Sequence, residues 1–120
     1  MKSILQRLEG SPGVVGAQVM TLDGVVVASI PEQDKEKHEK VAAFASNVLL
    51  SIEKDAETLG FVPLKRLTLW AGRGRLILMP IGEFAMVVLA DRNTDLSYTL
   101  MEVTGLARGL LRRSKIEVRS

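Results

Sequence analysis

The stretch that decides the fold reads GVVGAQVMTLDGVVVAS and occupies residues 13–29. Valine and alanine recur at every second position over residues 15–19, which is the period of a half-buried strand. The dipeptide Asp23-Gly24 then supplies a turn, because it tolerates positive φ at low cost. A second β-branched run continues to Ile30, so the stretch predicts a β-hairpin.

The glycines of this hairpin raise the alternative of a phosphate-binding loop. A Walker-type loop needs Gly-Lys-Ser/Thr opening a helix, and that sequence is absent. In a dinucleotide fingerprint the last glycine leads into a helix, whereas here Gly24 leads into another strand. We therefore interpret the glycines as punctuation of strands and expect no cofactor.

Helical patterns flank the hairpin. Residues 2–9 predict a short amphipathic helix, and Pro31 ends the hairpin. Asp34 can cap a long helix over residues 35–59, which Gly60 ends. The apolar stripe of this helix steps by three and four residues and consists of Val41, Ala45, Val48, Leu49, Ile52, Ala56 and Leu59.

Three strand patterns follow at residues 65–71, 75–81 and 84–90, separated by short turns that imply antiparallel neighbours. The last two are apolar at consecutive positions, which indicates that helices cover both faces of the sheet. Asn93 or Thr94 can cap a final helix. We predict one α+β domain over residues 1–120, a five-stranded antiparallel sheet sandwiched between helices in the order α-β-β-α-β-β-β-α. The stripe of the final helix consists of Leu96, Leu100, Val103, Ala107 and Leu110.

Composition excludes several classes of protein. The chain has 120 residues, a formal net charge of +2 and no cysteine, so disulfides and thiolate metal sites are excluded. No apolar run approaches the roughly 20 residues that span a bilayer, and the first residues hold no signal peptide. We expect a cytoplasmic protein.

The sequence offers little catalytic chemistry. His38 lies among lysines and glutamates, and we interpret it as a solvated helix residue without a metal or catalytic role. The acids of residues 32–57 alternate with lysines, as ion pairs on a wet helix face do. Ser46 and Ser51 have no histidine nearby, so we expect a protein that is not an enzyme.

A basic cluster near the end of the chain leaves three interpretations open. It can complement the dipole of the final helix, attract an acidic protein or anionic membrane, or bind nucleic acid. Aromatic residues for base stacking are few, and we expect no nucleic-acid partner and at most indirect membrane association. The cluster consists of Arg108, Arg112, Arg113, Lys115 and Arg119.

The strand pattern at residues 66–71 follows a loop and has one hairpin neighbour in sequence, which is typical of a sheet edge. Unpaired backbone groups at such an edge are a template for another chain. Trp70 on this strand either faces such a chain or packs under a helix of its own chain; the pattern leaves both open.

The order of elements and several motifs resemble the roadblock/dynein light chain family. The motifs are Leu5 and Leu8 of the first helix, GVVGA at residues 13–17, LDGVVVA at residues 22–28, the strand pair around residues 67–70 and 76–79, and the closing helix over residues 96–111. The resemblance covers essentially the whole chain. Longin- and profilin-like folds share the five-stranded sheet between helices and are the alternatives.

The resemblance implies a non-enzymatic dimer whose edge strands pair into one continuous sheet. Family members bind and regulate small Ras-like GTPases, as bacterial polarity regulators of the MglB type do, and others are dynein adaptors. The resemblance leaves open whether the protein accelerates GTP hydrolysis, promotes nucleotide exchange or only anchors the GTPase. Arg73 and Arg75 lie at a turn from which an arginine finger could reach out.

We therefore expect a homodimeric scaffold or regulator of a small Ras-like GTPase. The alternatives are an adaptor without a GTPase partner and a longin- or profilin-like ligand-binding module. Symmetry would bring two copies of the helix 35–59 together, which places a partner-binding strip of Phe44, Asn47 and Ser51 at the centre. The expected dimer interface consists of Arg66, Leu67, Thr68, Leu69, Trp70, Ala71 and Val48.

Overall fold

A computed structural model describes the backbone of residues 2–119 and the side chains of residues 4–109. The predicted order of helices and strands is confirmed. The elements are α1 (Lys2–Leu8), β1 (Val14–Thr21), β2 (Val26–Ile30), α2 (Lys35–Leu59), β3 (Leu67–Trp70), β4 (Arg75–Ile81), β5 (Phe84–Ala90) and α3 (Ser97–Arg119).

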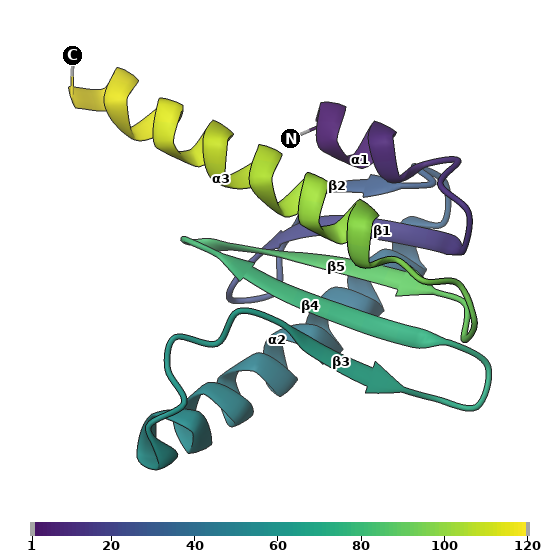
Figure 1. Cartoon of the computed structure of the whole chain (residues 1–120), viewed down its shortest axis with the longest axis horizontal. Helices are drawn as coiled ribbons and strands as arrows, with labels where there is room; N and C mark the ends of the chain where they lie inside the picture. Colours follow the sequence, from purple (N-terminus) through teal and green to yellow (C-terminus); the bar gives the residue numbers. More distant parts are fainter. Residues whose placement is uncertain (1, 120) are drawn as a thin grey trace.

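The five strands form one antiparallel sheet in the order β2-β1-β5-β4-β3 (Figure 1). Residues 13–29 form the predicted hairpin, and β5 pairs with β1 to join it to the later strands. The two strands at the edges are consequently β2 and β3. The predicted position of β3 at a sheet edge is confirmed.

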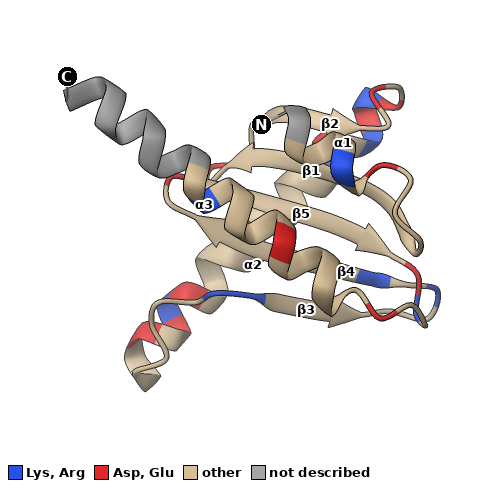
Figure 2. Cartoon of the chain, turned by 45° about the horizontal axis from the view of Figure 1, so that its top comes forward, with Lys and Arg blue, Asp and Glu red and all other residues tan. Residues whose placement is uncertain are grey.

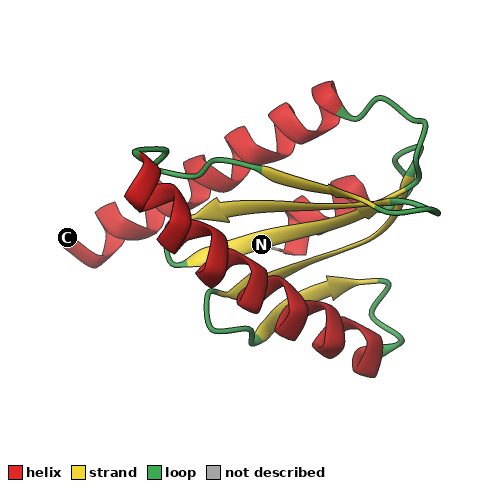
Figure 3. Cartoon of the chain, turned by 90° about the horizontal axis from the view of Figure 1, so that it is seen from below, coloured by secondary structure: helices red, strands yellow, loops and turns green. Residues whose placement is uncertain are grey.

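The sheet lies between two helical layers, with α2 on one face and α1 and α3 on the other (Figure 3). The central strands β1, β4 and β5 bury side chains on both faces, which explains their apolar runs. The core under α2 contains Met20, Ala42, Ala45, Leu49, Leu78, Ala85 and Val87. The core under α1 and α3 contains, among others, Ile4, Leu5, Leu8, Val19, Ile77, Val88, Leu96 and Val103.

Two glycines allow the hairpin to pack closely against α2 and against the loop before α3. Gly24 has a φ of 95°, and an added Cβ would lie 3.2 Å from the Cβ of Ser46 on α2. Gly13 has a φ of 85°, and an added Cβ would lie 2.5 Å from the Cβ of Thr94, in the loop before α3. Both positions need glycine because of the left-handed backbone and the close neighbour.

The predicted beginning of α2 at residue 35 is confirmed, but the caps predicted for the two long helices are wrong. Asp34 precedes α2, but its backbone is left-handed and its side chain makes no capping hydrogen bond. The α3 helix begins at Ser97, so neither Asn93 nor Thr94 is its cap. Instead, Asp95 Oδ1 accepts a hydrogen bond from Ser97 N at 2.9 Å. The predicted end of α2 at Gly60 is confirmed, with a left-handed glycine.

The length of α2 exceeds the width of the sheet. Its 25 residues span about 37 Å at 1.5 Å per residue, whereas the centres of five strands span about 19 Å. Of its residues after Leu49 only Ala56 is buried. The C-terminal part of α2 therefore extends past β3 (Figure 1). None of the helices in the described part of the chain has an apolar stretch of the length that crosses a membrane.

Candidate interaction surface

The open edge at β3 combines half-buried and exposed side chains. Trp70 is 66% exposed, so the alternative in which it packs under a helix is wrong. The expected interface residues next to the strand, Arg66 and Ala71, are also exposed. The strand residues Leu67, Thr68 and Leu69 are half-buried.

The backbone of β3 alternates between its neighbour and the open side. The N–H of Ala71 donates to the carbonyl of Gly74 at 2.8 Å, so these two residues form a hydrogen-bonded pair. Such pairs alternate with non-bonded pairs along an antiparallel ladder, and Leu69 therefore turns its backbone groups toward β4. Thr68 and Trp70 turn theirs to the open side. β3 thus offers outward donors and acceptors at regular two-residue spacing.

Exposed apolar side chains lie where the chain turns from the overhanging end of α2 toward β3. Leu59, Phe61 and Val62 are all exposed there. Charged residues gather mainly on the helices and loops, whereas the strands are mostly uncharged (Figure 2). Several exposed apolar side chains therefore lie on the β3 side of the molecule, Trp70 at the end of the strand and these three before its beginning.

The expected partner-binding strip lies on the outer surface of α2. Phe44 is 45% exposed and lies outside the buried core, and Asn47 and Ser51 are exposed as well. Val48 is half-buried and packs against the core under α2. Steps of four and three residues place Phe44, Val48 and Ser51 along one flank of the helix.

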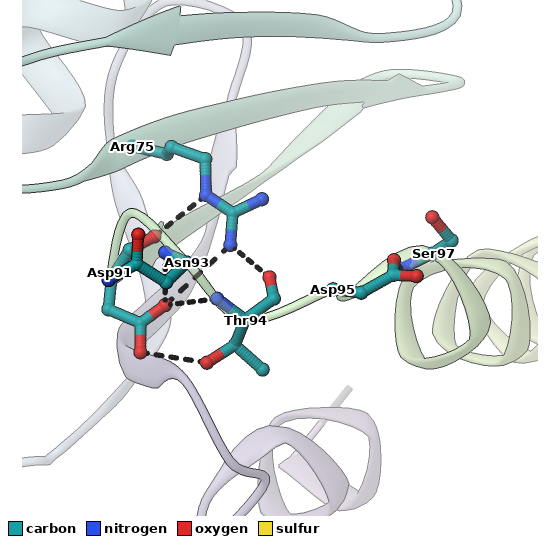
Figure 4. A network of polar contacts seen from close by, with 6 residues as sticks. All are labelled: Arg75, Asp91, Asn93, Thr94, Asp95 and Ser97. Atoms are coloured by element: carbon teal, nitrogen blue, oxygen red, sulfur yellow. Dashed lines mark hydrogen bonds and ion pairs between the residues drawn. The ribbon is translucent and has the colours of Figure 1, made fainter.

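A polar network behind the β3–β4 hairpin has Arg75 at its centre (Figure 4). Arg75 Nε donates to the carbonyl of Asp91 at 2.7 Å, and Nη2 donates to the carbonyl of Thr94. The guanidinium also lies 3.8 Å from Asp91 Oδ1 and 5.2 Å from the centroid of the Trp70 ring. The Arg75 side chain is only 11% exposed.

The loop between β5 and α3 is held by its own carboxylates as well. Asp91 accepts hydrogen bonds from Thr94 N at 2.9 Å and from Thr94 Oγ1 at 2.8 Å. These hydrogen bonds, led by the one from the Thr94 backbone, lower the pKa of Asp91. The hydrogen bond from the Ser97 backbone likewise lowers the pKa of Asp95.

The interpretation of Arg75 as a candidate arginine finger is wrong, because its guanidinium is mostly covered and donates to backbone carbonyls of its own chain. Arg73 is exposed on the same hairpin. The sequence could not reveal this network, since backbone carbonyls carry no side-chain signal.

The interpretation of His38 as a solvated residue is also wrong. His38 is 5% exposed, and its Nε2 lies 2.7 Å from the carbonyl of Pro31. A spacing of four, three and four residues puts His38 on one face with Ala42, Ala45 and Leu49, and this period was the available signal. Ser46 is buried too, and its hydroxyl donates to the carbonyl of Leu22 at 2.8 Å.

The opposite edge, at β2, lies in a groove of about 1000 Å³. Residues of α1 and of the first turns of α2 line it together with β2, among them Leu5, Gln6, Lys35 and Glu39. The β1–β2 pairing shifts register between Val19 and Met20, which is the mark of a β-bulge. This edge is therefore interrupted and flanked by helices.

No cluster of potential metal ligands occurs among the residues whose side chains are described. Of the basic cluster near the end of the chain, Arg108 is exposed. Arg112, Arg113, Lys115 and Arg119, like Leu110 of the predicted stripe, have side chains outside the described residues.

Comparison with known proteins gives both family and structural matches. Residues 2–90 match the model of the Roadblock/LC7 domain. Three uncharacterized proteins of Methanocaldococcus jannaschii are 26% identical over 117 residues, which cover 98% of this chain and 92–95% of theirs. Myxococcus xanthus MglB superimposes with a TM-score of 0.83 at 12% identity, over 92% of this chain and 94% of MglB. A Roadblock/LC7 domain from Streptomyces avermitilis gives a TM-score of 0.78 at 19% identity, over 93% and 98% of the two chains.

Proposed function

Because the chain belongs to the Roadblock/LC7 family, we propose that it is a non-enzymatic, homodimeric scaffold that binds and regulates a small Ras-like GTPase. The observation that carries the dimer is the open β3 edge, with outward backbone groups at Thr68 and Trp70 and a largely exposed indole. The GTPase rests on the resemblance of the sequence to family members that bind such proteins.

In this proposal two copies of β3 pair antiparallel and continue the sheet. A β3–β3 pair exchanges few hydrogen bonds because the strand has four residues. Side chains therefore have to supply much of the affinity. Trp70 and the apolar residues at the overhanging end of α2 provide such area. The proposed interface consists of Arg66, Leu67, Thr68, Leu69, Trp70, Ala71 and Val48.

The GTPase docks, in this proposal, on the strip formed by Phe44, Asn47 and Ser51. A partially exposed aromatic side chain among small polar ones is the usual anatomy of an interface anchor with its rim. Two-fold symmetry brings two such strips near the axis, so one GTPase can occupy both and leave a two-to-one complex.

The test is a titration of Ras-like GTPases from the source organism, loaded with GDP or a GTP analogue, against the wild type, Phe44→Ala and Leu50→Ala. Phe44→Ala should weaken binding by about 1–3 kcal/mol, whereas Leu50→Ala, an exposed apolar residue elsewhere on α2, serves as the matched control. Both variants should stay dimeric in sedimentation and keep the wild-type melting temperature.

Equal affinity of the wild type and Phe44→Ala would show that this face of α2 is not the docking surface. A dimer that binds no Ras-like GTPase would instead identify a stand-alone scaffold.

A further inference from the structure

The side chain of Arg75 touches two regions that are distant in sequence. Trp70 and Arg75 are directly opposed in the β3–β4 ladder, and their side chains therefore share one face of the sheet. On that face the guanidinium lies over the indole, with 5.2 Å to the ring centroid. Its edge donates to the carbonyls of Asp91 and Thr94 (Figure 4).

These contacts hold the guanidinium in one orientation. An arginine donates from its edge while its flat faces stay available for stacking. Two carbonyls on the edge and a carboxylate at 3.8 Å fix the plane of the group, and the side chain is only 11% exposed. The indole is otherwise largely exposed, so Arg75 gives the Trp70 side chain a preferred position at the open edge.

We propose that Arg75 is a positioning residue that couples the β3 edge to the loop before α3, so that pairing of two copies at β3 tightens the hold on residues 91–95. This inference rests on the proposed dimer. A second copy at the edge would exclude water from the exposed side of Trp70, and a desolvated cation–π contact is stronger than a wet one. The coupling is reciprocal, so a partner that loosens the loop weakens the dimer.

The loop of residues 91–95 also contacts the beginning of β1 and leads into α3. Thr94 lies against Gly13 at the beginning of β1, and the N–H of Asp91 donates to the Gly13 carbonyl at 2.8 Å. The helix α3 begins three residues after Thr94. The state of the β3 edge is thus communicated to the base of α3, on the face of the sheet opposite to α2.

The experiment measures solvent exchange of Arg75 Nε–H and Thr94 N–H by NMR over a dilution series, with sedimentation of the same samples. In the wild type, exchange of both protons should slow roughly fivefold or more as dimer replaces monomer. Arg75→Lys keeps the charge but loses the planar fork. It should weaken the dimer several-fold and abolish the concentration dependence at Thr94. Arg73→Lys, on the same hairpin but outside the network, is the matched control and should behave as the wild type.

A second variant allows the proposal to be tested even if Arg75→Lys does not fold. Trp70→Leu keeps an apolar edge and all hydrogen bonds from Arg75 to the loop, but it removes the indole. Exchange of the Thr94 N–H should then be equally fast in the monomer and in the dimer. A wild type that stays monomeric would refute the proposed dimer itself. A wild-type dimer with unchanged exchange, or an Arg75→Lys dimer that still slows exchange at Thr94, would refute the coupling alone.

Discussion

β2 and β3 both end the sheet, yet their edges differ in pairing, surroundings and side chains. β3 pairs with β4 without interruption, whereas the β2 ladder shifts register between Val19 and Met20. Residues of α1 and α2 flank β2, whereas the β3 side exposes Trp70 and, after the end of α2, Phe61 and Val62. A bulge breaks the two-residue spacing of outward backbone groups, and this is a known way to keep an edge from pairing.

The molecule thus protects one edge of its sheet and leaves the other ready to pair with a strand. Val27 on β2 and Val25 just before it are exposed, so apolar character alone does not distinguish the edges. The difference lies in regular backbone spacing and in access. This is why we place the second copy at β3.

The largest expected effect separates the two sides of the β3 backbone. Leu69→Pro removes an N–H that faces β4 and leaves the opposing carbonyl of half-buried Leu76 without its donor, so the free energy of unfolding should fall by about 2–3 kcal/mol. Thr68→Pro removes only an outward N–H, and the monomer should lose less than about 1 kcal/mol. Urea denaturation at concentrations where the protein is monomeric measures both. Similar losses in the two variants would mean that the alternation along β3 is assigned wrongly.

A lysine introduced on each edge strand tests directly whether β3 rather than β2 pairs with the second copy. Trp70→Lys removes the exposed indole and puts an ammonium on the open edge. It should weaken the dimer by about 2 kcal/mol, or roughly thirtyfold. Val27→Lys makes the equivalent change on β2 and should alter the dimer dissociation constant by less than about twofold. Sedimentation velocity over a dilution series gives both constants. A stronger effect at Val27 would reverse the assignment of the edges.

The smallest expected effect is a loss of loop stability at acidic pH. The fold lowers the pKa of Asp91 and of Asp95, so the ionised carboxylates stabilise the loop beside the β3–β4 hairpin. This contribution is fully present above the ordinary aspartate pKa of about 3.9 and is lost as the pH falls through the lowered values. The amide resonances of Thr94 and Ser97 should titrate with midpoints below that ordinary value. Asp91→Asn should remove the titration at Thr94, and midpoints at or above the ordinary value would contradict the hydrogen bonds described.

Much of the fold was predictable because it is written in local patterns. Alternation over residues 15–19, the Asp23-Gly24 turn and the periodic stripe of α2 each fix an element from its own residues, and they predict its bounds closely. The edge position of β3 also followed, since the strand has one hairpin neighbour.

The errors arose where tertiary contacts decide. Charged neighbours suggested that His38 is solvated, but its own helical position turns it toward the sheet and the Pro31 carbonyl. Asp34 has the right side chain for a cap but the wrong backbone conformation. The role of Arg75 depends on carbonyls 16 and 19 residues away, which no local pattern reveals.

The absence of cysteine allows single-cysteine crosslinking to test the β3 pairing most directly. Opposed residues of an antiparallel pair share a sheet face, so in a symmetric β3–β3 ladder one residue lies opposite its own copy. Thr68 and Leu69, in the middle of the strand, are the two candidates for that residue. Thr68→Cys and Leu69→Cys report these two registers, and Val27→Cys is the control at β2.

Under mild oxidation one of the two β3 variants should form a disulfide-linked dimer readily, because Cα atoms about 4.5–5.5 Å apart suit the bond. The other β3 variant, offset by a register step, and Val27→Cys should crosslink slowly. Rapid crosslinking of Val27→Cys, or none in either β3 variant while sedimentation shows a dimer, would contradict pairing at β3.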